Sequence, residues 1–249
     1  MAFVFEKHFA HDKIDEAFEM TKKIQVEYFT DILCIWAYGA QIRIEQLQQD
    51  FPEQVTVTPR YIPLFASTGE HIDKGWADKG GFAGFSQHTL DVARDWDHVR
   101  VHPNIWTGDV PASSTSTHLF IKAVQLLEQQ GAIETSTETE LPSTTLAWNL
   151  RKHFFAEQQN IARREVQCAL AESMNLPVSA IQDKLNCGEA HAALHADIEA
   201  QKRYQVAGSP TLILNEGRQQ LYGNVGYRII EANMRELLHN PQFGEASWC

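Results

Sequence analysis

The sequence predicts an α/β protein whose single sheet is assembled from two parts of the chain on either side of a block of helices. Three observations predict this fold class. Residues 24–62 show a strand pattern, a helical pattern and a second strand pattern. Residues 64–198 have helical spacing but almost no strand signals. Residues 206–238 show a β-hairpin followed by an amphipathic helix.

The bulk composition limits the functions to consider. With 249 residues and 43% hydrophobic content, the chain can bury a large core. A formal charge of −11 argues against nucleic acid or an anionic membrane surface as a main partner. No secretory signal and no run of about 20 apolar residues is apparent, so we expect a cytoplasmic protein with no membrane contact.

The first part of the chain begins with a polar, amphipathic arm over residues 1–23, which we expect to be helical. It would pack on the body of the protein or on a second subunit, which leaves a homodimer open. Val26 and Tyr28 alternate with polar residues and indicate a strand over 24–30. Apolar residues at helical spacing then predict a helix over 35–50, which Phe51 and Pro52 end.

Residues 55–62 are a second strand candidate, closed by Pro63. A strand, a helix and a strand of these lengths form a βαβ unit with a parallel pair and a right-handed crossover. Residues 64–88 are rich in glycine and aromatic residues, which suits an irregular, partly mobile segment rather than a long helix.

Helical patterns then return, at residues 115–130, 146–155, 161–174, 178–185 and 191–204. Ser143 and Ser179 are candidate helix caps, and Gly131 is placed to end a helix. Residues 206–215 and 219–222 form the predicted antiparallel hairpin, because only a short turn separates them. A final amphipathic helix is predicted over 227–238.

Cys34 lies where the first strand pattern gives way to the first helical pattern. Free backbone N–H groups and the positive end of the helix dipole favour a thiolate at such a position. We therefore expect a reactive thiol with a lowered pKa; the alternative interpretation is a small buried apolar residue. The other cysteines, Cys168, Cys187 and Cys249, form no C-x-x-C pair.

Two motifs carry a family resemblance. Residues 31–38, Asp-Ile-Leu-Cys-Ile-Trp-Ala-Tyr, resemble the D-x-x-C-P-W-C-Y active-site stretch of DsbA-like proteins of the thioredoxin superfamily. Residues 206–212, Val-Ala-Gly-Ser-Pro-Thr-Leu, look like the cis-proline loop of that superfamily, and 221–227 like the turn after it. The group includes FrnE and 2-hydroxychromene-2-carboxylate isomerases.

The resemblance implies a thioredoxin fold with a large helical domain inserted between its βαβ and ββα halves. The thioredoxin-like domain would comprise residues 24–63 and 199–240, and the inserted helical domain residues 64–198.

In this family Pro210 would face Cys34, the nucleophile. A cis bond before Pro210 would leave the Ser209 backbone free to pair with an extended substrate, as in strand addition. Trp36 and Tyr38 flank the thiol and either pack or line a substrate groove, with residues 76–85 as a candidate lid. Related glutathione-binding enzymes place polar pocket residues where this chain has Ser113, Ser114 and His118. Asn224, in the turn after the hairpin, is a further candidate.

This chain departs from the family at two positions: Ala37 replaces the second active-site cysteine, and Ile35 replaces the proline. Ala37 cannot release a mixed disulfide by internal attack. Three mechanisms stay open. In the first, Cys34 acts as a monothiol oxidoreductase with glutathione or a protein thiol as partner. In the second, Cys187 resolves the mixed disulfide, and in the third the chemistry is not redox.

The last mechanism would make the protein a glutathione-dependent isomerase or transferase of the 2-hydroxychromene-2-carboxylate isomerase or kappa-class type. Serine usually occupies the reactive position there, so Cys34 argues mildly against it. A non-catalytic binding module is a third reading. We expect no tightly bound cofactor, with glutathione as a co-substrate at most. We also expect no metal site, because His191 and His195 lack a third ligand.

Overall fold

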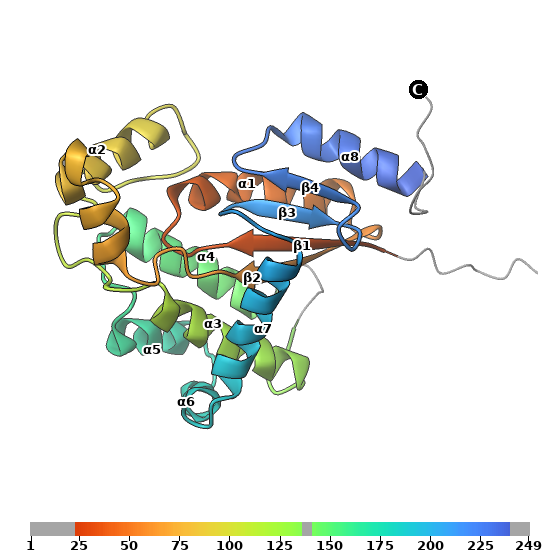
Figure 1. Ribbon diagram of the computed structural model, residues 1–249. Helices are drawn as coiled ribbons and strands as arrows, with labels where there is room; N and C mark the ends of the chain where they lie inside the picture. The colour runs from red at the N-terminus through yellow and green to blue at the C-terminus, as the bar shows by residue number, and fades with distance from the viewer. Residues whose placement is uncertain (1–22, 136–140, 240–249) are drawn as a thin grey trace, which may run out of the picture.

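The computed structural model describes residues 23–135 and 141–239. The predicted N-terminal arm lies almost entirely outside these residues, as does Cys249. Four strands form one mixed sheet in the order β2-β1-β3-β4. They are β1 (Ile24–Thr30), β2 (Val55–Tyr61), β3 (Thr211–Leu214) and β4 (Gln219–Tyr222). The fold is the predicted α/β class, with a thioredoxin-like sheet and a helical insertion (Figure 1).

The register of the sheet joins the two parts of the chain. β1 pairs with β2 in parallel, with Thr30 opposite Tyr61, and with β3 antiparallel, with Phe29 opposite Thr211. The parallel pair requires the crossover through α1 (Ile35–Asp50). Pro59 is tolerated in β2 because β2 is an edge strand. The carboxyl end of β1, which leads to Cys34, therefore lies beside the start of β3, which follows Pro210.

Two apolar clusters cover the two faces of the sheet. On one face, Val26 and Tyr28 pack with α1 and with α8 (Tyr227–His239). On the other face, Phe29 and Ile213 pack with Ala200 of α7 (Glu189–Arg203). The alternation of side chains along β1 thus places its successive residues in different layers.

The insertion holds the remaining helices: α2 (Gly81–Ala93), α3 (Thr115–Gln129), α4 (Pro142–Phe155), α5 (Arg164–Ser173), α6 (Val178–Asn186) and α7. Its aromatic core reaches the first helix of the sheet domain, because Tyr38 of α1 stacks on Phe155 of α4 with ring centroids 4.7 Å apart. No helix in the described part of the chain combines the length and apolarity needed to span a bilayer.

Residues 64–88 are more regular than expected. They contain short turns at Glu70–Lys74 and Ala77–Lys79, and α2 begins at Gly81. Gly80 and Gly81 adopt positive φ values of 90° and 56°, which turn the chain into the helix. A Cβ on Gly84 would lie 1.7 Å from the Lys79 carbonyl oxygen, so glycine permits the close approach there. The glycines in this segment therefore build a helix start.

The two predicted serine caps are wrong. α4 begins four residues earlier than predicted, with Leu141 as its N-cap and Pro142 in the first turn. Ser143 lies within the helix, where its N–H and hydroxyl both donate to the Glu128 carboxylate, at 2.6 and 2.7 Å. Ser179 lies inside α6, which starts after Pro177. Gly131, with φ of 68°, directly follows the C-cap of α3 as expected.

Candidate active site around Cys34

Cys34 is the N-cap residue of α1 and is 7% exposed. Its thiol donates a hydrogen bond to the Ser209 carbonyl oxygen, with Sγ and O 3.3 Å apart. The Ser209–Pro210 peptide is cis. Two segments separated by 175 residues therefore meet at the thiol, in the arrangement that the two motifs imply.

Asp31 organises the thiol loop, residues 31–34, which carries Cys34. Its Oδ1 accepts from the Leu33 N–H at 2.8 Å, and its main-chain oxygen accepts from the Cys34 N–H at 3.2 Å. These bonds form a tight local turn between the end of β1 and the start of α1. Asp31 is fully buried, so its side chain is fixed by the protein rather than by water.

The same carboxylate joins the loop to the insertion. Its Oδ2 accepts from the Phe65 N–H at 3.0 Å and from the Ser114 hydroxyl at 2.8 Å. The Asp31 main-chain N–H donates to the Ser209 hydroxyl at 3.0 Å. One residue therefore connects the thiol loop, the segment after β2, the start of α3 and the cis-proline loop.

The electrostatics at Cys34 differ from the prediction. Burial raises the pKa of the Cys34 thiol, and the Asp31 carboxylate raises it further. The Ser209 side chain and the N–H groups of Ala37 and Trp36 act in the opposite direction, but burial is the largest effect. The predicted lowering of the pKa is therefore wrong for this structure, because burial outweighs the N–H groups at the start of the helix.

The aromatic residues after Cys34 separate into two roles. Trp36 is 38% exposed and packs edge-to-face on Trp96, with centroids 5.7 Å apart. Tyr38 is 2% exposed and belongs to the core, where its hydroxyl donates to the Arg100 carbonyl. Ala37 is fully buried. Trp36 is thus available at the surface to contact a substrate, whereas Tyr38 packs α1 against the core of the insertion.

The predicted lid over residues 76–85 packs mainly within the insertion. Trp76 and Phe85 contact each other at 5.1 Å, and Phe85 lies against Trp106. The residue that reaches Trp36 is instead Trp96, in the segment after α2. A Cβ on Gly39 would lie 2.3 Å from its ring, so a glycine at that position allows Trp96 to rest on α1.

The three polar candidates at the start of α3 differ in whether they contact the thiol loop. Ser114 binds Asp31, as described above. His118 is fully buried, and its Nε2 accepts from the Ile32 N–H at 3.1 Å and lies 3.7 Å from Asp31 Oδ1. Burial lowers the pKa of His118, which keeps the imidazole neutral. Ser113 only accepts from the Thr115 N–H and reaches no residue of the thiol loop in the described bonds.

Asn224 lies beside the cis-proline loop. Its Oδ1 accepts from Arg43 of α1 at 2.6 Å, and the preceding Gly223 N–H donates to the Pro210 carbonyl at 2.8 Å. This contact ties the turn after β4 to α1, and so fixes the cis-proline loop against the helix that begins at Cys34.

Cys187 is exposed but lies at the opposite end of the insertion. Its thiol donates to the Glu189 carboxylate at 3.3 Å, and the Glu189 side chain lies near Gln130, just past the end of α3. The start of α3, by contrast, contacts the thiol loop. Since α3 has 15 residues, about 22 Å of helix separates the two places. The structure does not bring Cys187 to Cys34.

Two residues that the sequence did not single out complete the site. Asp31 appeared only as a letter of the motif. Arg151 of α4 is 3% exposed and donates to the Thr30 hydroxyl at 2.6 Å and to the Asp31 carbonyl at 3.5 Å. The aspartate of the D-x-x-C motif was the only sequence signal for Asp31. No local pattern marks Arg151, because its hydrogen-bond partners lie about 120 residues away in the chain.

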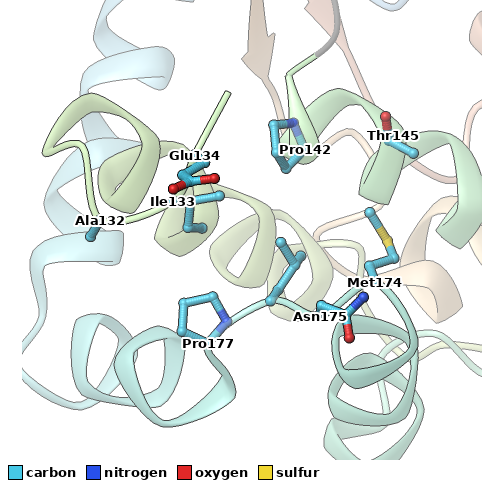
Figure 2. Close-up of a pocket in the computed structure, with 9 residues that line it drawn as sticks. Ala132, Ile133, Glu134, Pro142, Thr145, Met174, Asn175 and Pro177 are labelled. Atoms are coloured by element: carbon cyan, nitrogen blue, oxygen red, sulfur yellow. The ribbon is translucent and has the colours of Figure 1, made fainter. Parts of the chain in front are cut away.

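Nothing in the described part of the chain gathers three metal-ligating side chains. A cavity of about 700 Å³ opens between the α3–α4 and α5–α6 connections, lined by residues such as Ile133, Pro142 and Met174 (Figure 2). It borders the far end of α3 and contains no residue of the thiol loop or cis-proline loop. Glu134 is the one ionisable side chain in its described lining.

Known proteins resemble this chain in sequence and in fold. The ClpXP adapter protein SpxH of Halalkalibacterium halodurans is 21% identical over 238 residues, which cover 91% of this chain and 72% of that protein. Among solved structures, one described as a probable DsbA oxidoreductase from Streptomyces coelicolor superposes with a TM-score of 0.66 at 17% identity, covering 90% of this chain and 94% of the other.

The cytosolic disulfide reductase DsbM of Pseudomonas aeruginosa, also solved with GSH, gives a TM-score of 0.60 at 18% identity, over 85% of this chain and 99% of that one. A 2-hydroxychromene-2-carboxylate isomerase gives 0.60 at 17% identity, over 87% and 97%. These likenesses show a shared fold. The family model described as thioredoxin matches residues 28–232, and the chain therefore belongs to the thioredoxin family.

Proposed function

We propose that this protein is a thiol–disulfide oxidoreductase that uses Cys34 as a single active-site thiol and glutathione, or a protein thiol, as its partner. The observation that carries the proposal is the contact of Cys34 Sγ with the Ser209 carbonyl, 3.3 Å away, next to the cis peptide before Pro210. The likeness to a cytosolic disulfide reductase solved with GSH supports a small thiol partner.

The reaction begins when Cys34 loses its proton. The thiolate attacks one sulfur of a disulfide, forms a mixed disulfide and releases the other sulfur as a thiolate, which takes up a proton. With a glutathionylated substrate, Cys34 retains the glutathione sulfur and the substrate leaves as a thiol. A second glutathione thiolate then attacks that glutathione sulfur, which forms oxidised glutathione and releases Cys34 as a thiolate.

Ser209 couples deprotonation to substrate binding. In the resting protein its carbonyl accepts the Cys34 S–H. Once the thiol has lost this proton, the carbonyl is free to accept a backbone N–H from an extended substrate segment. The same event thus creates the nucleophile and opens the acceptor that positions the substrate.

The surroundings of Cys34 favour an external resolving thiol. The position three residues after Cys34 is the buried Ala37. Cys187 is about one helix length away, and Cys168 contacts Gln182 of α6 instead, with Sγ and Nε2 3.7 Å apart. Neither described cysteine reaches the mixed disulfide, so a diffusing thiol is the natural resolving partner.

Substitution of the thiol tests the proposal. Cys34→Ser should abolish reduction of a glutathionylated peptide and formation of a mixed disulfide detectable by intact mass, whereas the matched control Cys187→Ser should retain both. Activity that depends on Cys187 would transfer the resolving role to that residue. Full activity in Cys34→Ser would refute thiol chemistry.

A glutathione-dependent isomerase is the second candidate, because the fold is shared with a 2-hydroxychromene-2-carboxylate isomerase. Turnover of an aromatic substrate that survives in Cys34→Ser would favour it. A non-catalytic binding module, which the missing second cysteine keeps open, would show no disulfide reduction and no glutathione transfer.

A further inference from the structure

A positively charged side chain lies beside the cis-proline loop and takes no part in the contacts that hold the thiol. Arg43 of α1 donates through Nη1 to Asn224 Oδ1 at 2.6 Å and to the Gly39 carbonyl at 3.3 Å. Both partners are neutral oxygens, and the ion pairs among the described residues do not include Arg43. The charge of its guanidinium is therefore not balanced within the described part of the chain.

Two nitrogens of the Arg43 guanidinium are available to a ligand. Nε and Nη2 make no hydrogen bond within the described residues, and neither is one of the buried nitrogens that lack a partner. Both therefore reach solvent, unlike Nε of Arg151, which is buried. Nε and Nη2 form one edge of the planar guanidinium, and such an edge binds the two oxygens of a carboxylate. Asn224 holds Nη1 at the same time, and so orients this edge.

The neighbours of Arg43 place it next to the proposed substrate site. Its partner Asn224 follows Gly223, whose N–H donates to the Pro210 carbonyl at 2.8 Å. Arg43 and Pro210 also line the same hollow, with a volume of about 10 Å³. This hollow is too small to hold a substrate, but it shows that the arginine borders the cis-proline. A substrate bound across Ser209 and Pro210 would therefore pass close to the guanidinium.

The distance along α1 limits the size of the ligand. The Arg43 guanidinium reaches back to Gly39, which follows Cys34 by five residues and lies about 7.5 Å further along the helix axis. Two residues of extended chain span about 7 Å. Trp36, which is 38% exposed, precedes Arg43 by seven residues and so lies on the same side of the helix. A ligand that extends from the thiol along this side of α1 would reach Arg43 about two residues from its sulfur.

We propose that Arg43 is a specificity-determining residue, which binds a carboxylate of the thiol or disulfide substrate about two residues from the reacting sulfur. This inference rests on the proposed function, because it concerns the substrate of the same site. A tripeptide-sized thiol with a carboxylate at each end, such as glutathione, has this form. Its carboxylate would balance the charge of Arg43, while its sulfur lies at Cys34 and the Ser209 carbonyl.

S-Methylglutathione tests this site without a redox step, because its sulfur can neither form nor exchange a disulfide. In titration calorimetry, the full-length protein should bind it more tightly than its diethyl ester, which has no carboxylate. Arg43→Met should weaken binding of the acid about ten-fold or more, and should remove the preference for the acid over the ester. Structural damage alone would weaken both ligands equally. Arg163→Met, at a surface ion pair with Asp109, is the matched control and should keep the preference.

Two further variants separate charge from geometry. Arg43→Lys keeps the positive charge but loses the two-nitrogen edge, so its preference for the acid should be intermediate. Asn224→Asp keeps the arginine but supplies a carboxylate to it, and should weaken binding of the acid about ten-fold while affecting the ester less.

A preference for the acid that survives in Arg43→Met would overturn this inference. So would a failure of the unmodified protein to bind S-methylglutathione. Binding that depends on Arg43 in a protein that reduces no disulfide would refute only the proposed function. Disulfide reduction by a protein whose binding of the acid does not depend on Arg43 would refute only this inference.

Discussion

The Asp31 main-chain N–H donates a hydrogen bond to the Ser209 hydroxyl, with N and Oγ 3.0 Å apart and 178 residues between them in the chain. The Ser209 carbonyl accepts from the Cys34 thiol. Ser209 therefore holds the thiol loop at two points, one through its side chain and one through its backbone. The alignment of sulfur and cis-proline loop depends on this residue.

Ser209→Ala should disturb both stability and reactivity. The Asp31 N–H would be left buried without a partner, which costs about 1–3 kcal/mol of unfolding free energy. The Ser209 side chain also lowers the pKa of Cys34, so its loss should raise that pKa and slow alkylation at neutral pH. Denaturant unfolding and iodoacetamide kinetics measure the two effects. Ser209→Thr keeps a hydroxyl and should restore the alkylation rate; equal rates in both variants would contradict the role of the hydroxyl.

The carboxylate of Asp31 opposes the thiolate. Asp31→Asn removes a buried negative charge that raises the pKa of Cys34, so the pKa should fall and alkylation at neutral pH should accelerate. The variant should also lose stability, because an amide cannot accept from all of the donors Leu33, Phe65 and Ser114. Ser114→Ala is the control. It removes one hydrogen bond to Asp31, worth about 1 kcal/mol, but keeps the charge, so it should destabilise the protein without accelerating alkylation.

The pH dependence of Cys34 alkylation in the unmodified protein follows from the balance between burial of the thiol and the start of the helix. Burial raises the pKa of Cys34 above its ordinary value of about 8.5. The thiol form should therefore dominate at neutral pH, and the alkylation rate should climb as the pH rises through the elevated pKa. Cys187, which is exposed, provides the internal comparison when each cysteine is followed by peptide mass. A Cys34 profile with its midpoint below that of Cys187 would show that the helix start outweighs burial.

The sequence was sufficient for the parts of this site that depend on local pattern and order along the chain. The strand before Cys34, the helix after it and the turn at Ser209 are local signals, and the family resemblance indicated that they meet. The sign of the pKa shift could not be obtained in this way. The helix start is visible in the sequence, but the burial that outweighs it comes from distant packing around Cys34.

The same limit applies to Asp31 and Arg151. Their partners, among them Phe65, Ser114 and Thr30, lie between 34 and 121 residues away. Hydrogen bonds over such separations have no periodicity that a sequence reveals. The helix α2 was missed for a different reason, because its glycines at 80, 81 and 84 are typical of loops, whereas here they allow a left-handed turn and a close backbone approach.

A buried ion network joins the insertion to the sheet. Asp197 of α7 is fully buried and binds Arg60 at 3.1 Å, the Tyr61 N–H at 2.9 Å and Lys122 of α3 at 2.9 Å. Asp197→Asn would leave the buried Lys122 without its counter-charge, while Arg60 would keep its ion pair with Glu27. The substitution should cost about 3–5 kcal/mol. Asp109→Asn, at the exposed pair with Arg163, is the control and should change the unfolding free energy little. If Asp197→Asn lowers the unfolding free energy as little as this control does, the buried network does not stabilise the protein.

Gly39 tests the contact between α1 and the segment after α2. Alanine is the better helix former, which would favour Gly39→Ala by up to about 1 kcal/mol. The added Cβ, however, would lie 2.3 Å from the Trp96 ring, and overpacking of this kind typically costs about 1–3 kcal/mol. Steric overlap should win, so the variant should unfold at lower denaturant. Because Trp96 packs on Trp36, the tryptophan fluorescence should change as the two rings separate.

Gly226→Ala is the matched control: its Cβ would meet open space, and the substitution should leave stability and fluorescence within error of the unmodified protein. A Gly39→Ala variant that is as stable as this control, with unchanged fluorescence, would mean that Trp96 does not rest on α1 in solution.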